Sequence, residues 1–219
     1  MLALAAFFAI TGPNDVASFW FRHGIADTDA ILSGAVHQAV TALTLHSNFK
    51  HLLGNVLIGR ALFAVVHRRL GPGLGSIAVQ MSGVVGNLMN AVWHLTGHRS
   101  LGASTAVMGA LGILAATQLV MNQARGPTAK AVVTWAPLVA GAALLGMFGA
   151  SPTSDLHAHG FGFVEGVVMG LIAGVIRHRN TPLPLWFSAV MGAVSLLIVV
   201  GAWVVALAFW PAHHVFRIG

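Results

Sequence analysis

The sequence contains no cysteine and few charged residues. Without cysteine the chain forms no disulfide and offers no thiolate for catalysis, and the redox compartment is not indicated. Only 7% of the 219 residues are charged whereas 57% are hydrophobic, and the mean hydropathy is +0.83. A water-soluble fold would lack the polar residues needed to cover its surface. The composition therefore predicts a protein embedded in a lipid bilayer.

Acidic residues are scarcer than basic ones, and the sequence pI is about 11.7. In a soluble protein this excess of positive charge would indicate nucleic-acid binding. Here the basic residues occur in short runs between apolar stretches, where they set the orientation of membrane helices. We therefore predict no nucleic-acid partner, and the lipid bilayer is the expected surrounding.

Six apolar stretches are long enough to cross a membrane as helices, which takes about 20 residues each. Glycine or proline separates several of them, at 71–73, 126–127 and 182–184. The apolar run Met1–Thr11 is too short to span alone, so we expect a truncated or unusually short first helix, or one that lies in the interface. The six stretches are Leu45–Val66, Leu74–Leu95, Ala103–Val120, Ala131–Phe148, Leu156–Ile176 and Leu185–Trp210.

Basic residues are distributed unevenly between the two ends of these predicted helices. The end rich in arginine and lysine is predicted to be cytoplasmic, because positive loops stay inside. Most acidic residues and many histidines then fall at the external end, so polar chemistry is expected there. The basic residues of the cytoplasmic end are Arg68, Arg69, Arg125, Lys130, Arg177 and Arg179.

Three predicted helices enter the membrane from the external side with polar residues in their first turns. Polar groups inside a membrane are costly, so their convergence indicates a function. The segments are HSNFKHLLGN from His46, GASTAVMGALG from Gly102 and DLHAHGFGFVEG from Asp155.

These segments contain the parts of a serine hydrolase, which needs a hydroxyl, a base and donors aimed at the developing oxyanion. Ser104 begins a predicted helix, whose positive end would face that oxyanion. His159 is the candidate base, and Asn55 and His51 are the candidate oxyanion donors. His159 is followed by glycines on or next to the same helix face, which permit another helix to approach closely. These glycines are Gly162, Gly166, Gly170 and Gly174.

The three segments resemble the motifs of the rhomboid family of intramembrane serine proteases. The family pattern is a histidine, five residues later HxxxN, then GxSG, then AHxxGxxxG, and this chain matches it in order between residues 35 and 174. The matching residues are His46, His51 and Asn55, then Gly102, Ala103, Ser104 and Thr105, then Ala158, His159, Gly162 and Gly166.

This resemblance implies an all-α polytopic membrane bundle with a six-helix core and an added C-terminal helix at 185–210, forming a single domain over 1–219. It implies a serine endopeptidase that cleaves transmembrane protein substrates in or next to their membrane segments. The catalytic pair would be Ser104 and His159, without an acid and without a cofactor. The expected location is the bacterial inner (plasma) membrane, with the active site facing the external or periplasmic side.

Three features depart from the family pattern. Thr105 replaces the second glycine of GxSG, and it is expected to tighten the space beside the nucleophile. Met108 replaces an aromatic residue that packs on the histidine. His37 and Gln38 replace a Trp-Arg pair in the external loop, which bears on how the protein sits in the membrane. None of these changes removes a catalytic atom.

Alternative interpretations stay open for each candidate. Ser104 could be a small packing residue, His159 an interhelical hydrogen-bonding residue, and His51 and Asn55 partners of loop backbone. At the level of function, the alternatives are an inactive rhomboid-like protein that binds membrane helices and a small transporter. A transporter would favour inverted repeats, and we find no convincing one.

Two further polar groups have no place in this mechanism. His94, His98 and His157 are of a type that binds metals, but the chain lacks an HExxH motif and shows no carboxylate in register, so no metal is predicted. Arg60 and Glu165 have similar predicted depths on two helices that enter from the same side, so we expect them to pair inside the membrane.

Overall fold

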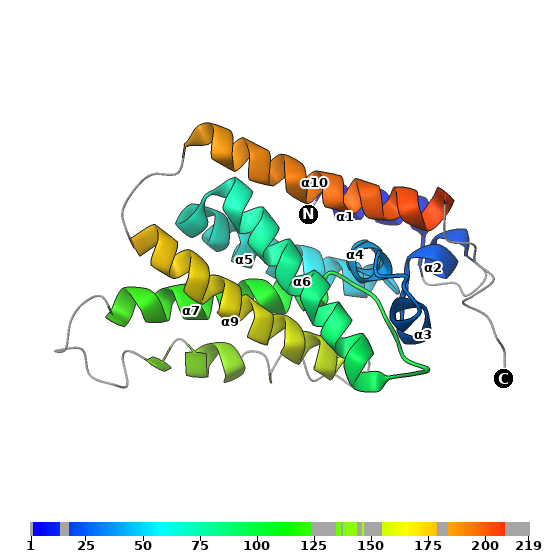
Figure 1. Ribbon diagram of the computed structural model, residues 1–219, viewed down its shortest axis with the longest axis horizontal. Helices are drawn as coiled ribbons and strands as arrows, with labels where there is room; N and C mark the ends of the chain where they lie inside the picture. The colour runs from blue at the N-terminus through cyan, green and yellow to red at the C-terminus, as the bar shows by residue number, and fades with distance from the viewer. Residues whose placement is uncertain are drawn as a thin grey trace.

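The computed structural model describes residues 2–13, 18–123, 135–136, 138–143, 146, 155–178 and 184–208. The fold is an all-α bundle whose long helices run along the molecule, while short elements gather at one end (Figure 1). This confirms the predicted polytopic helical architecture. The long helices are α5 (Phe49–Leu70), α6 (Pro72–His94), α7 (Ser104–Gln123), α9 (Leu156–His178) and α10 (Leu185–Ala208).

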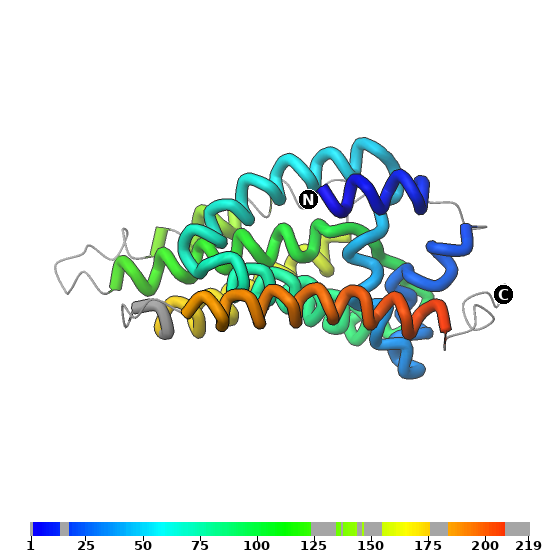
Figure 2. Tube along the Cα trace, turned by 90° about the horizontal axis from the view of Figure 1, so that it is seen from above, coloured from blue at the N-terminus to red at the C-terminus, as the bar shows by residue number. Residues whose placement is uncertain are grey.

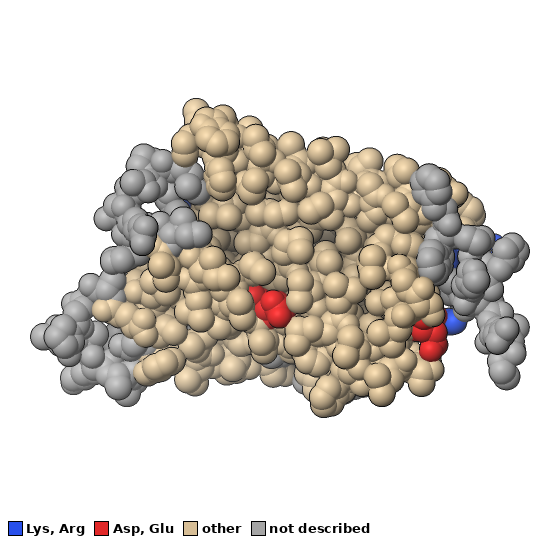
Figure 3. Space-filling model, viewed as in Figure 1, with Lys and Arg blue, Asp and Glu red and all other residues tan. Residues whose placement is uncertain are grey.

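Four of these helices, α5, α7, α9 and α10, are long and apolar enough to cross a membrane. Helix α6 has the length of a membrane span but no stretch of comparable hydropathy, and it lies at the centre of the bundle against the other four. Its Ser82, Asn87 and Asn90 side chains are buried there. The face of the molecule in Figure 3 is almost free of charged side chains, as lipid contact requires. Half of the predicted stretch Ala131–Phe148 lies outside the described residues, so its span is not tested.

The boundaries of α5 are set by capping residues, so the helix lies four residues further along the chain than the predicted apolar stretch. At its start, the side chain of Asn48 accepts a hydrogen bond from the backbone N–H of His51 at 2.9 Å. At its end, Gly71 adopts a φ of +84°, which glycine tolerates best, and Pro72 begins α6. Capping therefore decides which polar residues belong to the first turn.

Helices α7 and α9 form the most extensive helix pair among the described elements, and both begin at the same end (Figure 1). Glycines of α9 lie directly on the backbone of α7, which confirms the predicted close approach. The register is constant, because the paired residue numbers differ by 57 each time. The pairs are Gly162 with Thr105, Gly166 with Gly109, and Gly170 with Ile113.

Helix α6 joins this pair at a three-helix junction. A methyl group built on Gly86 would stand 2.8 Å from Cγ2 of Thr105 and 2.8 Å from the backbone nitrogen of Gly162. Thr105 is only 2% exposed. The methyl of Thr105 therefore packs between the helices, in space that Gly86 and Gly162 leave open.

The short elements surround the end at which α5, α7 and α9 begin, at the right of Figure 1, and we call it the Ser104 end. A two-residue strand pair, β1 with β2, ties this region together by aligning Ala26 with Ser100 and Asp27 with Arg99. The elements are α2 (Phe19–Gly24), β1 (Ala26–Asp27), α3 (Thr28–Leu32), α4 (Gln38–Thr41), η1 (Ala42–Thr44) and β2 (Arg99–Ser100).

Buried Asp27 is the centre of this end cap. Its carboxylate accepts hydrogen bonds from Nε of Arg99 at 2.7 Å and from the N–H of Ala30 at 3.2 Å. Its own N–H donates to Oε1 of Gln38 at 3.2 Å. Gln38, at one of the two positions where the family has Trp-Arg, thus helps to hold the loop that leads into α7.

Helix α1 (Leu2–Thr11) lies beside α5 (Figure 2), and it is shorter than a membrane span, as expected. Its Phe7 ring meets Trp203 of α10 with centroids 5.3 Å apart, and Trp203 donates to Oγ1 of Thr44 at 3.1 Å. The added C-terminal helix α10 is therefore anchored at the Ser104 end.

The predicted pairing of Arg60 with Glu165 is wrong. Arg60 is exposed on α5, a helix that packs chiefly on α6 and α7. The two ion pairs within the described part of the chain both lie at the Ser104 end. Equal depth in the membrane did not make the two helices neighbours.

The contact between α7 and α9 predicts that Gly166→Ala destabilises the protein. The new methyl group would collide with the backbone of Gly109, and overpacking of this kind costs about 1–3 kcal/mol. Gly160→Ala on the same helix is the matched control, because nothing lies within 4 Å of its added methyl. Thermal unfolding in detergent should show a lower midpoint for the first variant only, and equal midpoints would contradict the packing.

Candidate active site

Ser104 is the first residue of α7, as predicted. The chain reaches it through Gly102, whose φ of +118° favours glycine and whose N–H donates to the carbonyl of Ala42 at 2.9 Å. Because a helix leaves its first N–H groups unpaired, the Ser104 hydroxyl stands beside backbone donors at a positive helix end.

The His51 ring lies against Gly102, next to Ser104. A methyl group built on Gly102 would stand 2.7 Å from Nε2 of His51 and 3.6 Å from Oγ of Ser104. Any side chain there would thus displace the ring. Nδ1 of His51 lies 3.1 Å from the Ser47 hydroxyl, so Nε2 carries the proton when that hydroxyl donates. His51 then has a donor on the side of Ser104.

Asn55 lies one turn further along α5 and is only 6% exposed. Its Nδ2 atom is buried and has no hydrogen-bond partner within the described structure. A buried donor without a partner costs about 1–3 kcal/mol, so such groups call for an explanation. An acceptor that forms only during a reaction would provide one.

His159 lies in the first turn of α9 and is 5% exposed. Its imidazole is close enough to the His51 ring of α5 for the charges of the two rings to interact. Thr105 comes one residue after Ser104, and Gly162 comes three residues after His159. Thr105 and Gly162 are in contact. The constant register therefore brings the first turns of α7 and α9 together, so Ser104, His51 and His159 gather at one end of the bundle.

Fully buried His46 supports the His51 ring, which it meets at a centroid distance of 5.3 Å and an interplanar angle of 65°. Burial, with the nearby charge of His51 as a second cause, lowers the pKa of His46 to about 4. His46 is therefore neutral at pH 7. It adds no positive charge beside the candidate oxyanion donors.

Asp155 organises the start of α9, a role that the sequence analysis missed. Oδ1 accepts from the N–H of Ala158 at 3.1 Å, while Oδ2 accepts from Nδ2 of Asn90 at 2.6 Å and bonds to His98 at 2.7 Å. Burial raises the pKa of Asp155, but the hydrogen bonds and charge of His98 and the bond from Ala158 outweigh it and leave that pKa below its ordinary value. Its place three residues before Ala158 is a helix-capping signal that the sequence already contained.

Comparison with known proteins matches these features to one family. A family profile described as "Rhomboid domain" covers residues 33–176. The chain belongs to the rhomboid family. A protein of Bacillus subtilis named "Putative rhomboid protease YdcA" is 26% identical over 151 residues, which is 68% of this chain and 73% of the relative.

A second relative, "Rhomboid-like protease 2" of Toxoplasma gondii, is 25% identical over 160 residues, which is 73% of this chain and 54% of the relative. Family membership and the apolar helices make this rhomboid an integral membrane protein. All three motif segments lie within the matched range.

The low pKa of His46 predicts that the stability of this rhomboid falls in mild acid. The unfolded histidine binds a proton near pH 6.5 but the folded one only near 4, so stability is lost as pH falls from 6.5 to 4. The contribution is up to about 1.4 kcal/mol per pH unit. Unfolding measured against pH should show a steeper loss in the wild type than in His46→Gln, and parallel curves would contradict it.

Proposed function

We propose that this rhomboid is an intramembrane serine endopeptidase that hydrolyses peptide bonds in or next to transmembrane segments of membrane proteins. The observation that carries the proposal is the gathering of Ser104, His51 and His159 at one end of the bundle, through Gly102 and the α7–α9 register. The names of the two relatives, each of which contains the word protease, support the same activity. No cofactor is needed for this chemistry.

The reaction begins when His159 takes the proton of the Ser104 hydroxyl as the serine oxygen attacks the scissile carbonyl carbon. The tetrahedral intermediate collapses, and His159 passes the proton to the leaving amine. The acyl-enzyme ester is then hydrolysed by water, which His159 deprotonates. This releases the new carboxyl terminus and restores the hydroxyl.

Negative charge on the carbonyl oxygen needs donors that are in place before the reaction starts. Nδ2 of Asn55 is buried and without a partner in the described structure, and Nε2 of His51 faces Gly102 beside Ser104. The backbone N–H groups at the start of α7 complete the set. In this role the Nδ2 group of Asn55, which has no acceptor in the described structure, would donate a hydrogen bond to the oxyanion that forms in the transition state.

Purified protein in detergent or liposomes should cleave a generic transmembrane substrate, and Ser104→Ala and His159→Ala should abolish cleavage. Asn55→Ala should lower kcat by about 10²–10³ with little change in KM, because one oxyanion donor is lost. Gel analysis of the products with time gives these values. Ser33→Ala and His157→Ala are matched controls, the first an exposed serine and the second a histidine two residues before His159.

Two outcomes would overturn the assignment. Cleavage that persists in Ser104→Ala would exclude the serine as nucleophile. An absence of cleavage across a broad panel of substrates would favour the inactive, helix-binding alternative, provided that the wild type unfolds cooperatively.

We further propose that the Ser104 end faces outward, across a bacterial inner membrane, and that residues 1–219 act as one domain. The absence of cysteine allows a direct test, because single cysteines can be placed at will. Ser33 is exposed at the Ser104 end, and Gln123 is exposed at the far end of α7, so the two test variants are Ser33→Cys and Gln123→Cys. In intact bacterial cells a membrane-impermeant thiol reagent should label only the first, and the reverse pattern would invert the topology.

A further inference from the structure

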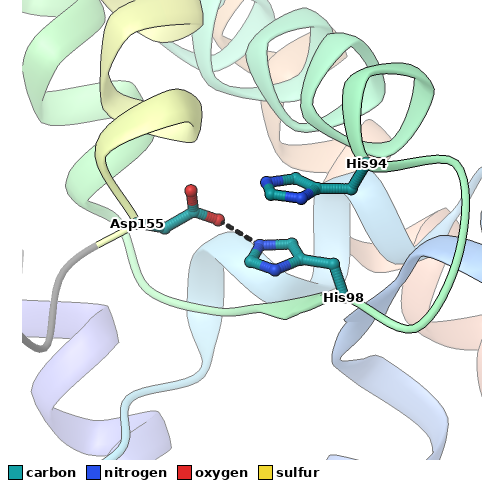
Figure 4. A group of neighbouring side chains, drawn as sticks. All are labelled: His94, His98 and Asp155. Carbon is teal, nitrogen blue, oxygen red and sulfur yellow. Dashed lines mark hydrogen bonds and ion pairs between the residues drawn. The ribbon is translucent and has the colours of Figure 1, made fainter.

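Three metal-binding side chains that the proposed mechanism does not use meet at the Ser104 end (Figure 4). His94 is the last residue of α6, His98 lies in the following loop, and Asp155 immediately precedes α9. One possible ligand atom of each lies within 4.8 Å of the other two. Asp155, 57 residues beyond His98, thus provides the carboxylate that the sequence did not show in register with the histidines.

The rings of His94 and His98 are packed closely, and one ring nitrogen of His94 has no hydrogen-bond partner in the described part of the chain. The rings of His94 and His98 lie nearly parallel, with centroids 3.7 Å apart and an interplanar angle of 11° (Figure 4). Nε2 of His94 is buried and has no hydrogen-bond partner in the described part of the chain. A ring nitrogen of this kind is expected to have a partner.

We propose that His94, His98 and Asp155 form a binding site for a zinc-type transition metal ion. Two imidazoles and one carboxylate are a ligand set that zinc uses, with a fourth position left for water. The ion would take the place of the proton shared between His98 and Asp155, which leaves to solvent.

The cluster is slightly too compact for an ion, so binding requires a defined rearrangement. Metal–ligand bonds of about 2.1 Å in tetrahedral geometry hold the ligand atoms roughly 3.4 Å apart. The 2.7 Å contact between His98 and Asp155 must therefore open, and the parallel rings must rotate until each ring plane contains the ion. Nδ2 of Asn90 already holds Oδ2 of Asp155 and would orient the carboxylate as a neighbour of the ligand.

Metal binding here would join the end of α6, the loop after it and the start of α9. Asp155 leads directly into the first turn of α9, which carries His159, so the bound ion would hold that turn against the end of α6. The binding itself does not depend on proteolysis and is tested without it.

The test uses tag-free protein in detergent, treated with a chelator and then titrated with Co²⁺ and Zn²⁺. We expect one ion per chain by calorimetry, intense visible absorption bands of tetrahedral Co²⁺ that Zn²⁺ abolishes, and a higher Tm with Zn²⁺. His94→Gln, His98→Gln and Asp155→Asn should each weaken binding at least about tenfold. His157→Gln is the matched control, because its ring lies 5.2 Å from that of His94 but outside the ligand set.

His94→Gln separates metal binding from a merely structural role, because it leaves the hydrogen bond between His98 and Asp155 in place. Its Tm without metal serves as its own baseline, because the ring contact with His98 is lost, and its shift in Tm on addition of Zn²⁺ should vanish. Failure of the wild type to bind one ion, or to give the Co²⁺ bands, overturns the proposal. An equal loss of affinity in His157→Gln and His98→Gln overturns this ligand set.

Discussion

The contact between the backbones of α7 and α9 is the constraint on which the rest of the candidate site depends. Gly162, Gly166 and Gly170, spaced by four on α9, carry no side chain that would hold the helices apart, and each of the three lies on the backbone of α7. Because the helices are parallel and in constant register, their first turns must meet. Helix packing alone therefore places Ser104 and His159 at the same end of the bundle.

The third helix of the junction, α6, explains how an unusual threonine fits. Thr105 stands at a glycine position of the family motif, yet its methyl lies in the space left by Gly86 and Gly162. The same helix carries polar side chains along its length, and those of Ser82, Asn87 and Asn90 are buried among the other helices. A polar helix is tolerated at the centre of a membrane bundle for this reason.

Buried polar groups at the Ser104 end differ in how far their hydrogen bonds are filled. Asp27 and Asp155 have their acceptors filled by hydrogen bonds from several segments, and they hold the loops and the start of α9. Asn55 and His94 each retain a buried nitrogen without a partner in the described structure, as do the supporting residues Gln38 and His46. Asn55 and His94 differ from those two in position, since Asn55 lies one turn beyond His51 on α5 and His94 lies beside His98 and Asp155. In surroundings of low dielectric an unpaired donor is expensive, and this cost supports the proposed roles of Asn55 and His94 in binding. Asp155 combines both properties, because it caps α9 and also belongs to the proposed metal site.

Some features were readable from residue order alone. The apolar lengths predicted the long helices, the histidine, serine and glycine motifs predicted the family, and the spacing of four predicted a close helix contact, since these depend on local periodicity. Other features needed tertiary structure. The pairing of Arg60 with Glu165, predicted from their similar depth in the membrane, was wrong because depth does not indicate which helices are neighbours. Only the packed bundle placed Asp155 against His98 and the His51 ring against Gly102, because those contacts join segments far apart in the chain.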